Sequence, residues 1–292
     1  MSRIVLLAAF LAALGPAAPR AQAQEARWEF GVSAGRMMPL FSTTFTSRFT
    51  APWLYDPSNT ADIEQTVRIR AEGALGIAAR IGRLVSSRWG IELAVDHFED
   101  VVSGRNPDYA VGLDYVSRQP PDYTPRSIQR AEHRSWPDTE GTASQTTVAA
   151  AVFYRAALSR SVFLDFSAGP ALSWLTVEAS SLGFSDYWFG GHSVVFSQDY
   201  ALPYTLSASF VPGLRLACRL QVELTRGIRL GLEAVGLAAV RSGADFELRP
   251  PDPEAAALLH RTLDEIEKLM GPPKPFLAPS FARLSAGLTI AL

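Results

Sequence analysis

The sequence predicts an all-β protein, an eight-stranded antiparallel up-and-down transmembrane β-barrel with short periplasmic turns and long external loops. Three observations predict this fold class. Eight segments alternate apolar and polar residues with a period of two, as strands with two unlike faces do. The connections between these segments are alternately long and short, which is typical of membrane barrels. No run of eighteen apolar residues follows the N-terminal segment, so a helical span is not predicted.

The first 23 residues are predicted to be a secretory signal peptide. Arg3 supplies a positive start, residues 4–14 are uninterrupted apolar, and the small residues Ala21 and Ala23 mark the cleavage site. A membrane anchor is the alternative, but the eleven apolar residues are fewer than the ~20 that a membrane helix needs. The expected organisation is therefore a signal peptide at 1–23 and a membrane β-barrel domain at 24–292.

The first four predicted strands each place apolar side chains on one face and small or charged side chains on the other. Each is long enough for the ~9–11 residues of a tilted membrane strand. Their ranges and leading apolar residues are 27–38 with Trp28, Phe30 and Val32; 71–82 with Leu75, Ile77 and Ile81; 88–99 with Trp89, Ile91 and Leu93; and 146–158 with Val148, Val152 and Tyr154.

The last four predicted strands repeat this pattern, with arginine and acidic residues between the apolar positions. Their ranges and leading apolar residues are 161–177 with Val162, Leu164 and Phe166; 208–224 with Leu214, Leu216 and Leu220; 227–240 with Ile228, Leu230 and Leu232; and 280–292 with Leu284, Leu288 and Ile290.

The connections predict the orientation of the barrel. Short turns are expected at 84–87, 158–160 and 225–226, and long loops at about 39–70, 100–145, 178–207 and 241–279. Because outer-membrane barrels have short periplasmic turns and long external loops, both chain ends are expected on the periplasmic side.

The last long loop contains one predicted helix, over 253–270. Asp252 is its expected N-cap and Pro253 its first residue, while Gly271 follows its last turn. One face of this helix is apolar (Leu259, Leu263, Ile266 and Met270). Three roles of this helix remain open. It could form a lid over the barrel mouth, dock a partner, or simply cover apolar surface of the loops.

The polar faces of the eight strands carry nearly balanced charge, which bears on whether the barrel is in a membrane or in solution. A soluble barrel with its apolar face inward is the main alternative. Small residues and paired charges suit the narrow inside of an eight-stranded barrel, since unpaired buried charge is costly. The inward acids are predicted to be Glu29, Glu72, Glu92, Asp96, Asp165, Glu223 and Glu233, and the inward arginines Arg80, Arg155, Arg215, Arg219, Arg229 and Arg283.

These charges are expected to form a paired network that plugs the lumen. Its predicted centre is Arg215, Arg219, Glu223, Arg229 and Glu233, because the turn at 225–226 makes their two strands neighbours. Aromatic residues support the membrane interpretation: Trp28 and Trp89 mark one rim, and Trp174 and Phe210 the other, as in an aromatic girdle.

The C-terminal residues 285–292 resemble the terminal strand signal of Gram-negative outer-membrane proteins. Gly287 and Ile290 match its glycine and alternating hydrophobic positions, and Leu292 replaces the usual terminal aromatic residue. The chain as a whole resembles the OmpA-type and OmpX-type eight-stranded barrels. The resemblance implies a location in the outer membrane of a Gram-negative bacterium, contact with its lipid and lipopolysaccharide, and insertion by the barrel-assembly machinery.

The net charge and the spacing of candidate ligand and catalytic residues bear on which classes of function the sequence predicts. A formal net charge of −2 gives no electrostatic basis for nucleic acid binding, and no cofactor or metal-ligand spacing is present. A lipid A deacylase of the resembled class uses His, Ser and an acid, and the candidate pairs in this chain are His97 with Ser103 and His192 with Ser193. Neither pair shows the expected spacing. A non-enzymatic, structural or surface-interaction role is predicted, with a lipid-modifying enzyme or a narrow solute pore as alternatives.

Overall fold

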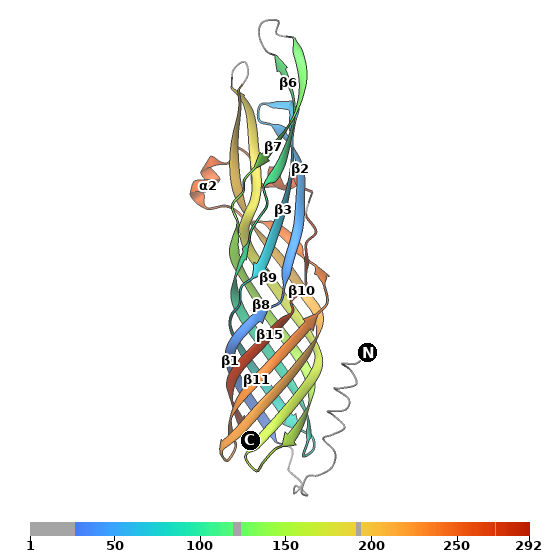
Figure 1. Cartoon of the computed structure of the whole chain (residues 1–292), viewed down its shortest axis with the longest axis vertical. Helices are drawn as coiled ribbons and strands as arrows, with labels where there is room; N and C mark the ends of the chain where they lie inside the picture. The colour runs from blue at the N-terminus through green and yellow to red at the C-terminus, as the bar shows by residue number, and fades with distance from the viewer. Residues whose placement is uncertain (1–26, 119–123, 191–193, 272) are drawn as a thin grey trace.

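The computed structural model describes residues 27–118, 124–190, 194–271 and 273–292. It is an elongated structure built almost entirely of antiparallel strands (Figure 1). The proposed signal peptide, with Ala21 and Ala23, lies outside the described residues.

Eight strands pair in a closed ring, each antiparallel to the next, and the last pairs with the first. They cross one another at a marked tilt around a common axis (Figure 1). Each of the eight segments predicted from the sequence falls on one of them. The ring strands are β1 (Trp28–Pro39), β4 (Ala74–Leu84), β5 (Trp89–Gly104), β8 (Thr139–Ala157), β9 (Val162–Gly190), β10 (Val194–Thr225), β11 (Ile228–Ala239) and β15 (Phe281–Ala291).

The predicted long loops at about 39–70, 100–145 and 178–207 are corrected, because most of their described residues form strands, whereas the fourth, 241–279, contains three short strands and two helices. Together with the ring, the described residues contain fifteen strands rather than the eight predicted. The additional strands are β2 (Ser42–Trp53), β3 (Asp56–Ala71), β6 (Tyr109–Arg118), β7 (Pro125–Arg134), β12 (Ser242–Gly243), β13 (Asp245–Leu248) and β14 (Phe276–Leu277).

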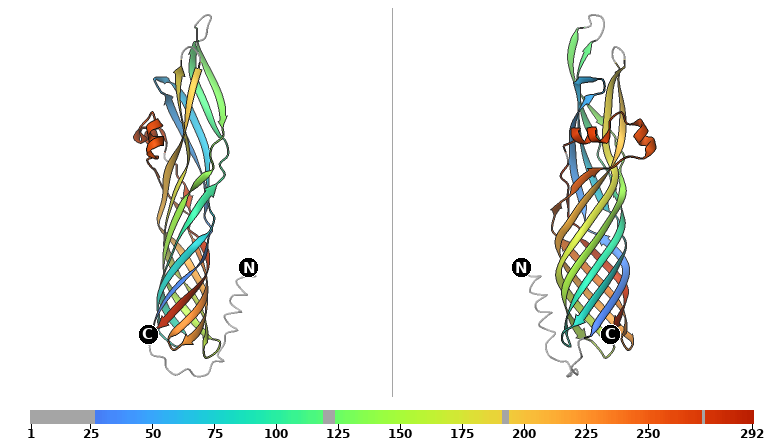
Figure 2. Two further views of the ribbon diagram at one scale, coloured as in Figure 1. Left: turned by 90° about the vertical axis from the view of Figure 1, so that its left-hand side faces the viewer. Right: turned by 180° about the vertical axis from the view of Figure 1, so that it is seen from behind.

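These strands, with the upper ends of β9 and β10, continue the barrel well beyond the ring (Figure 2). We call this part the extension; it comprises the described residues of 40–73, 105–138, 178–207 and 240–279. β2 pairs with β3 along almost its full length, β3 with β6, and β6 with β7. The 29-residue β9 and 32-residue β10 form a continuous hairpin that joins ring and extension.

The extension has an apolar core of its own, which explains why its segments are ordered. Alternate residues of β2 and β3 are buried in it, among them Phe45, Phe49 and Ile63. Phe49 stacks on Phe184 of β9 with ring centroids 5.2 Å apart, a geometry that adds to the free energy gained by area burial. The period-two pattern of these strands thus buries one face of each against the β9–β10 hairpin.

The single helix predicted over 253–270 is corrected to two shorter helices, α2 (Pro253–Leu258) and α3 (Leu263–Leu269). The break falls before Thr262, whose side chain accepts a hydrogen bond from the backbone of Glu265 while the Glu265 carboxylate accepts one from the Thr262 backbone. This capping box starts a new helix. Ile266 of α3 is buried in the core of the extension, and both helices are on one side of the molecule, with α2 projecting outward (Figure 2). Among the described residues, no helix is both long enough and apolar enough to cross a membrane.

The outside of the ring is apolar. Large hydrophobic side chains stay exposed on every ring strand, as Val32, Leu93 and Leu230 illustrate. Trp28 and Trp89 are exposed at the end that carries the tight turns, and Trp174 packs edge-on against Phe210 toward the other end, with ring centroids 5.3 Å apart. Because the polar residues alternate with these positions, they point into the ring.

Candidate functional site: the charged lumen

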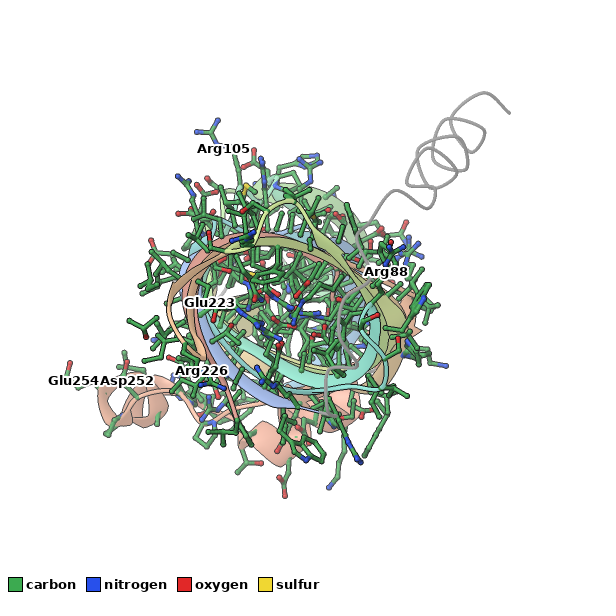
Figure 3. The ribbon with its side chains drawn as sticks, turned by 90° about the horizontal axis from the view of Figure 1, so that it is seen from below. Arg88, Arg105, Glu223, Arg226, Asp252 and Glu254 are labelled. Atoms are coloured by element: carbon green, nitrogen blue, oxygen red, sulfur yellow. The ribbon has the colours of Figure 1, made fainter. Side chains whose placement is uncertain are left out.

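The inside of the ring is filled by side chains. Viewed along the axis from the end with the tight turns, they occupy the space within the strands (Figure 3). Strand alternation places them there: on β5 the exposed Leu93 and Val95 flank Ala94, and the inward positions on either side carry Glu92 and Asp96. The lumen is therefore a packed interior in which most of the large groups are charged.

The cluster nearest the tight turns centres on Glu29 of β1. Its carboxylate accepts hydrogen bonds from Arg155 Nη1 at 2.6 Å, Arg155 Nη2 at 2.8 Å and Arg229 Nη1 at 2.6 Å. Arg155 also donates through Nε and Nη2 to Asp165, at 2.8 Å each. Two arginines and two carboxylates from β1, β8, β9 and β11 are thus joined across the lumen by charge-assisted hydrogen bonds.

A second cluster centres on Glu233 of β11. It accepts hydrogen bonds from Arg219 Nη2 at 2.8 Å and Arg283 Nη2 at 2.7 Å. Arg215 Nε donates to Asp96 Oδ2 at 2.9 Å, and Arg283 Nη1 lies 2.5 Å from Asp96 Oδ1. The guanidinium of Arg219 lies 3.4 Å from Glu92. This cluster ties β5, β10, β11 and β15 together around the bore.

The structure brings together most of the residues that the sequence assigns to the lumen. Ten of the eleven predicted network residues are almost wholly removed from solvent, namely Arg80, Glu92, Asp96, Arg155, Asp165, Arg215, Arg219, Arg229, Glu233 and Arg283. Glu29 joins them.

Two acidic residues differ from the expectation. Glu223, the remaining predicted network residue, lies at the mouth rather than at the network's centre, partly exposed and 3.9 Å from Arg229. The reason is the adjacent turn, where the β10–β11 register shifts between Glu223 and Thr225. Glu72, predicted to face the lumen, lies exposed between β3 and β4, outside any strand.

Above the charged clusters, apolar side chains lie inside the bore. Met37, Phe98 and Phe281 are buried together inside the upper ring, with Phe98 edge-on to Phe281 at 6.2 Å. The core of the extension follows. Close packing of this kind leaves few voids larger than a water molecule.

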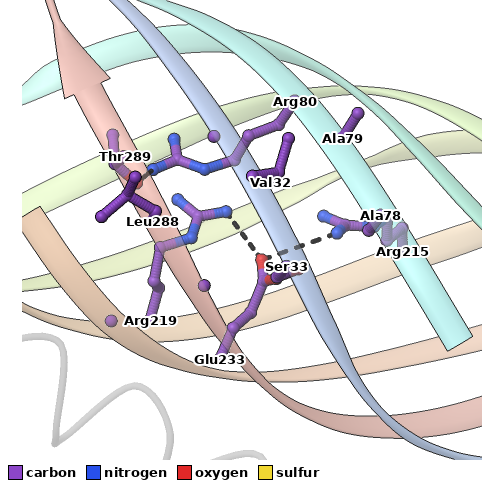
Figure 4. A pocket seen from close by; sticks show the side chains of 13 residues that line it. Val32, Ser33, Ala78, Ala79, Arg80, Arg215, Arg219, Glu233, Leu288 and Thr289 are labelled. Atoms are coloured by element: carbon purple, nitrogen blue, oxygen red, sulfur yellow. Dashed lines mark hydrogen bonds and ion pairs between the residues drawn. The ribbon is translucent and has the colours of Figure 1, made fainter. Parts of the chain in front are cut away.

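One small cavity lies within the charged layer (Figure 4). Its volume is about 20 Å³, and Arg80, Arg215, Arg219 and Glu233 line it together with Ser33.

The candidate catalytic histidine–serine pairs are not assembled in the described residues. His97 points outward from β5, and its Nδ1 lies 2.9 Å from the Thr146 hydroxyl. Ser103 lies six residues further along the same strand, opposite Glu140. His192 and Ser193 lie outside the described residues. No group of three or more His, Cys, Asp or Glu side chains suited to a metal ion occurs in the part of the chain that the structure describes.

The C-terminal residues complete the ring. Gly287 of β15 lies opposite both Ser33 and Gly231, and a Cβ there would clash with the carbonyl oxygen of Val32. Glycine is therefore required by close strand approach. Ile290 is exposed on the ring's outside, and the backbone of Leu292 donates to the Trp28 carbonyl at 2.9 Å.

Comparison with known proteins finds structural similarity only. No family model matches the chain, and no curated protein matches it. The outer-membrane protease OmpT of Escherichia coli is similar with a TM-score of 0.40 and 8% identity, covering 93% of this chain and 99% of that chain.

Two further solved structures are similar. For the outer-membrane protein OprG of Pseudomonas aeruginosa the TM-score is 0.37 and the identity 9%, covering 91% of this chain and 97% of that one. The attachment invasion locus protein Ail of Yersinia pestis, solved with a heparin analogue, is similar with a TM-score of 0.31 and 9% identity. The match covers 91% of this chain and 100% of that chain. Similarity at this level carries no information on activity or ligand.

The distribution of residues in this chain decides its class. A closed antiparallel ring with an apolar outside, aromatic residues at both rims and a charged inside is the reverse of a soluble barrel. The chain is therefore an antiparallel β-barrel whose faces are arranged as in membrane barrels rather than in soluble ones.

Proposed function

We propose that this protein is an integral outer-membrane barrel of a Gram-negative bacterium with a closed lumen and a structural or surface-interaction role. The eight ring strands span the membrane, and the extension projects from the cell surface. Lipid and lipopolysaccharide contact the ring, and the barrel-assembly machinery inserts it. The protein is not an enzyme in this proposal.

The apolar outside of the ring is the observation that carries the proposal. Leu230 and Leu232 of β11 remain 52% and 59% exposed, while Glu233 beside them is buried. A soluble barrel would reverse this arrangement, because exposed apolar surface of such extent favours association or a membrane. The ring strands β1, β4, β11 and β15 are 11 or 12 residues long, which is enough for the ~9–11 residues of a tilted strand that crosses a bilayer.

The packing of side chains inside the lumen supports a plug rather than a pore. Two ion-pair clusters and an apolar layer fill the bore in sequence from the tight turns to the extension. An eight-stranded ring leaves an interior just wide enough for side chains to fill. A role that depends on solute passage would require these groups to separate.

The extension supports a role at the cell surface. Its core contains several large aromatic side chains, such as Trp53, Phe184 and Tyr204, so it is a rigid body rather than a set of loose loops. Rigid elements present a binding surface at a lower entropic cost than loops that must first be ordered.

Site-specific labelling in cells tests the proposed placement. In a Cys218→Ala background, Ala110→Cys introduces a thiol in the extension and Ser87→Cys one in the turn between β4 and β5, both at exposed positions. A membrane-impermeant maleimide should label Ala110→Cys in intact cells, and Ser87→Cys only after the outer membrane is permeabilised. Labelling of Ser87→Cys alone in intact cells would invert the orientation, and equal labelling of both would contradict a membrane-spanning ring.

Mass spectrometry of lipid A tests the non-enzymatic part of the proposal. Cells with and without the protein should contain lipid A of the same acyl composition. A mass difference equal to one acyl chain, produced by the protein, would establish the lipid-modifying alternative.

A further inference from the structure

A shallow groove crosses the outside of the ring near the end with the tight turns. Its volume is about 480 Å³, and residues of β1, β4, β5, β8 and β9 line it. On β8 and β9 the lining side chains include the small, exposed Ala150, Ala168 and Pro170. The larger Leu93 of β5 lies opposite Ala150. The apolar outside of the ring is thus hollowed where the sequence places small residues on neighbouring strands.

One accessible cation lines this otherwise apolar groove. Arg83 of β4 is exposed, and its guanidinium lies 5.4 Å from the ring centroid of Trp28, its partner in the β1–β4 register. Within the described part of the protein, Arg83 forms no ion pair with a carboxylate. Glu92, the one acid in the lining, is buried and points into the lumen. A cation–π contact therefore holds the Arg83 guanidinium at the level of the aromatic rim.

The rim below the groove is positive. The β4–β5 turn contributes Arg88, which Figure 3 shows on the periphery of the ring, and the β8–β9 turn contributes the exposed Arg160. The acids at this end of the four strands, Glu92 and Asp165, are both buried in the lumen. Glu223 of β10, the next strand, is partly exposed but lies at the mouth of the lumen. This side of the rim therefore favours a ligand with net negative charge.

An anionic phospholipid combines the two properties that the groove requires. Its acyl chains are apolar, and its phosphate is the kind of group that a guanidinium binds with paired hydrogen bonds. In the proposed placement, the end with the tight turns lies in the periplasmic leaflet and its aromatic rim lies at headgroup level. Arg83 then lies at the level of the phosphates, and the groove extends from it toward the acyl chains.

We propose that this groove binds one molecule of an anionic phospholipid of the phosphatidylglycerol type. An acyl chain lies over Ala150 and Ala168, and the Arg83 guanidinium donates hydrogen bonds to the phosphate. The proposal deepens the proposed function and rests on it, because the groove meets lipid only if the ring spans a membrane. Lipopolysaccharide is not the proposed ligand, since it occupies the opposite leaflet.

Native mass spectrometry of the full chain tests the proposal. The protein is inserted into vesicles of phosphatidylglycerol and phosphatidylcholine in equal amounts, extracted into mild detergent, and weighed together with the lipid that it retains. One phosphatidylglycerol molecule per protein is expected, in several-fold excess over phosphatidylcholine. Equal retention of the two lipids, or a dimer of the protein without lipid, would overturn the proposal.

Three variants locate the site. Arg83→Gln should lower the retention of phosphatidylglycerol several-fold. Ala150→Trp fills the groove but leaves every arginine in place, and it should lower the retention of both lipids. Arg226→Gln is the matched control, because Arg226 is exposed in the β10–β11 turn and does not line the groove. It should retain as much phosphatidylglycerol as the unaltered protein. An equal fall in Arg83→Gln and Arg226→Gln would mean that headgroups bind wherever the rim is positive, and would overturn the proposal.

The outcomes separate this site from the proposed function. Protein that inserts into the vesicles but retains no phosphatidylglycerol overturns the site alone. Protein that does not insert contradicts the membrane placement and the site with it. The measurement is repeated with lipid A added to the vesicles. Retention of lipid A in preference to phosphatidylglycerol would assign the groove to the other leaflet and overturn the proposal.

Discussion

The carboxylate of Glu29 on β1 accepts hydrogen bonds from both terminal nitrogens of Arg155 on β8, at 2.6 and 2.8 Å. These strands are not neighbours, because β4 and β5 separate them in the ring. The pair therefore crosses the bore. It couples opposite walls of the barrel and occupies the lumen at that level.

Removal of Glu29 should be strongly destabilising. Glu29→Ala leaves Arg155 and Arg229 without a shared acceptor in a buried site, and breaking a buried pair in this way typically costs about 3–5 kcal/mol of folding free energy. Urea titration of the protein in lipid vesicles measures the change. Glu72→Ala is the matched control, since Glu72 is exposed and surface substitutions usually change stability by less than about 0.5 kcal/mol. A similar effect of both variants would contradict the buried network.

A charge on the outside of the ring tests which face meets lipid. Leu230→Arg, at an exposed position of β11, should cost about 2–4 kcal/mol if that position is near the bilayer midplane. The same titration in lipid measures this cost. Ala110→Arg, exposed on β6 of the extension, should be nearly neutral. If Leu230→Arg proved as harmless as the control, the outside of the ring would not be in lipid.

One ion pair between Arg261 and the buried Asp186 helps to hold the helical segment on the strands of the extension. Arg261 Nε donates to Asp186 Oδ1 at 2.7 Å, and Arg261 Nη2 donates to the carbonyl of Pro52. Burial raises the pKa of Asp186, and the neighbouring Arg261 opposes that rise. Arg261→Ala should therefore raise the Asp186 pKa further and loosen the segment that carries α2 and α3.

Limited proteolysis measures that loosening. Cleavage within 249–271 should be several-fold faster in Arg261→Ala than in the unaltered protein, while Lys268→Ala, an exposed position of α3, should leave the rate unchanged. Equal rates in all three proteins would show that Arg261 does not hold the segment.

Alkaline pH should destabilise the extension. Burial raises the pKa of Tyr187, Tyr200 and Tyr204 to about 12 each, against about 10 in an unfolded chain. The folded state therefore holds more protons than the unfolded state in this interval. The stabilisation is complete below pH ~10 and is lost as the pH rises toward 12. Ultraviolet absorbance of tyrosinate should show late, cooperative titration of these residues, and titration at the free-tyrosine pH would contradict their burial.

The ring can be predicted from the sequence because its signals are local. Period-two alternation and tight turns such as Thr225-Arg226 need no information from distant residues. The inward arginines and acids follow from the same alternation, and the structure pairs residues such as Arg219 and Glu233 directly across neighbouring strands. Cross-bore contacts such as Glu29 with Arg155 could not be predicted, because the tilt and register that bring these two residues together depend on closure of the whole ring.

The extension is not predicted by the sequence analysis, although its signal is present. Phe45 and Phe49 alternate with Thr46 and Arg48 along β2, which is strand periodicity in a segment interpreted as a loop. Because membrane barrels commonly have long external loops, this short stretch of alternation is interpreted as part of a loop rather than as a strand. The helix break is likewise visible in Thr262 and Glu265, whose spacing is that of a capping box. The position of Glu72 cannot be read from alternation, since the strand begins only after it.

Single-channel recording in planar lipid bilayers tests the central claim most directly. The unaltered protein should show no steady conductance, and Glu233→Ala should lower stability without opening a channel, because Arg215, Arg219 and the apolar layer still fill the bore. Steady conductance of the unaltered protein, with Glu233→Ala changing ion selectivity but not stability, would show a water-filled lumen and contradict the closed barrel.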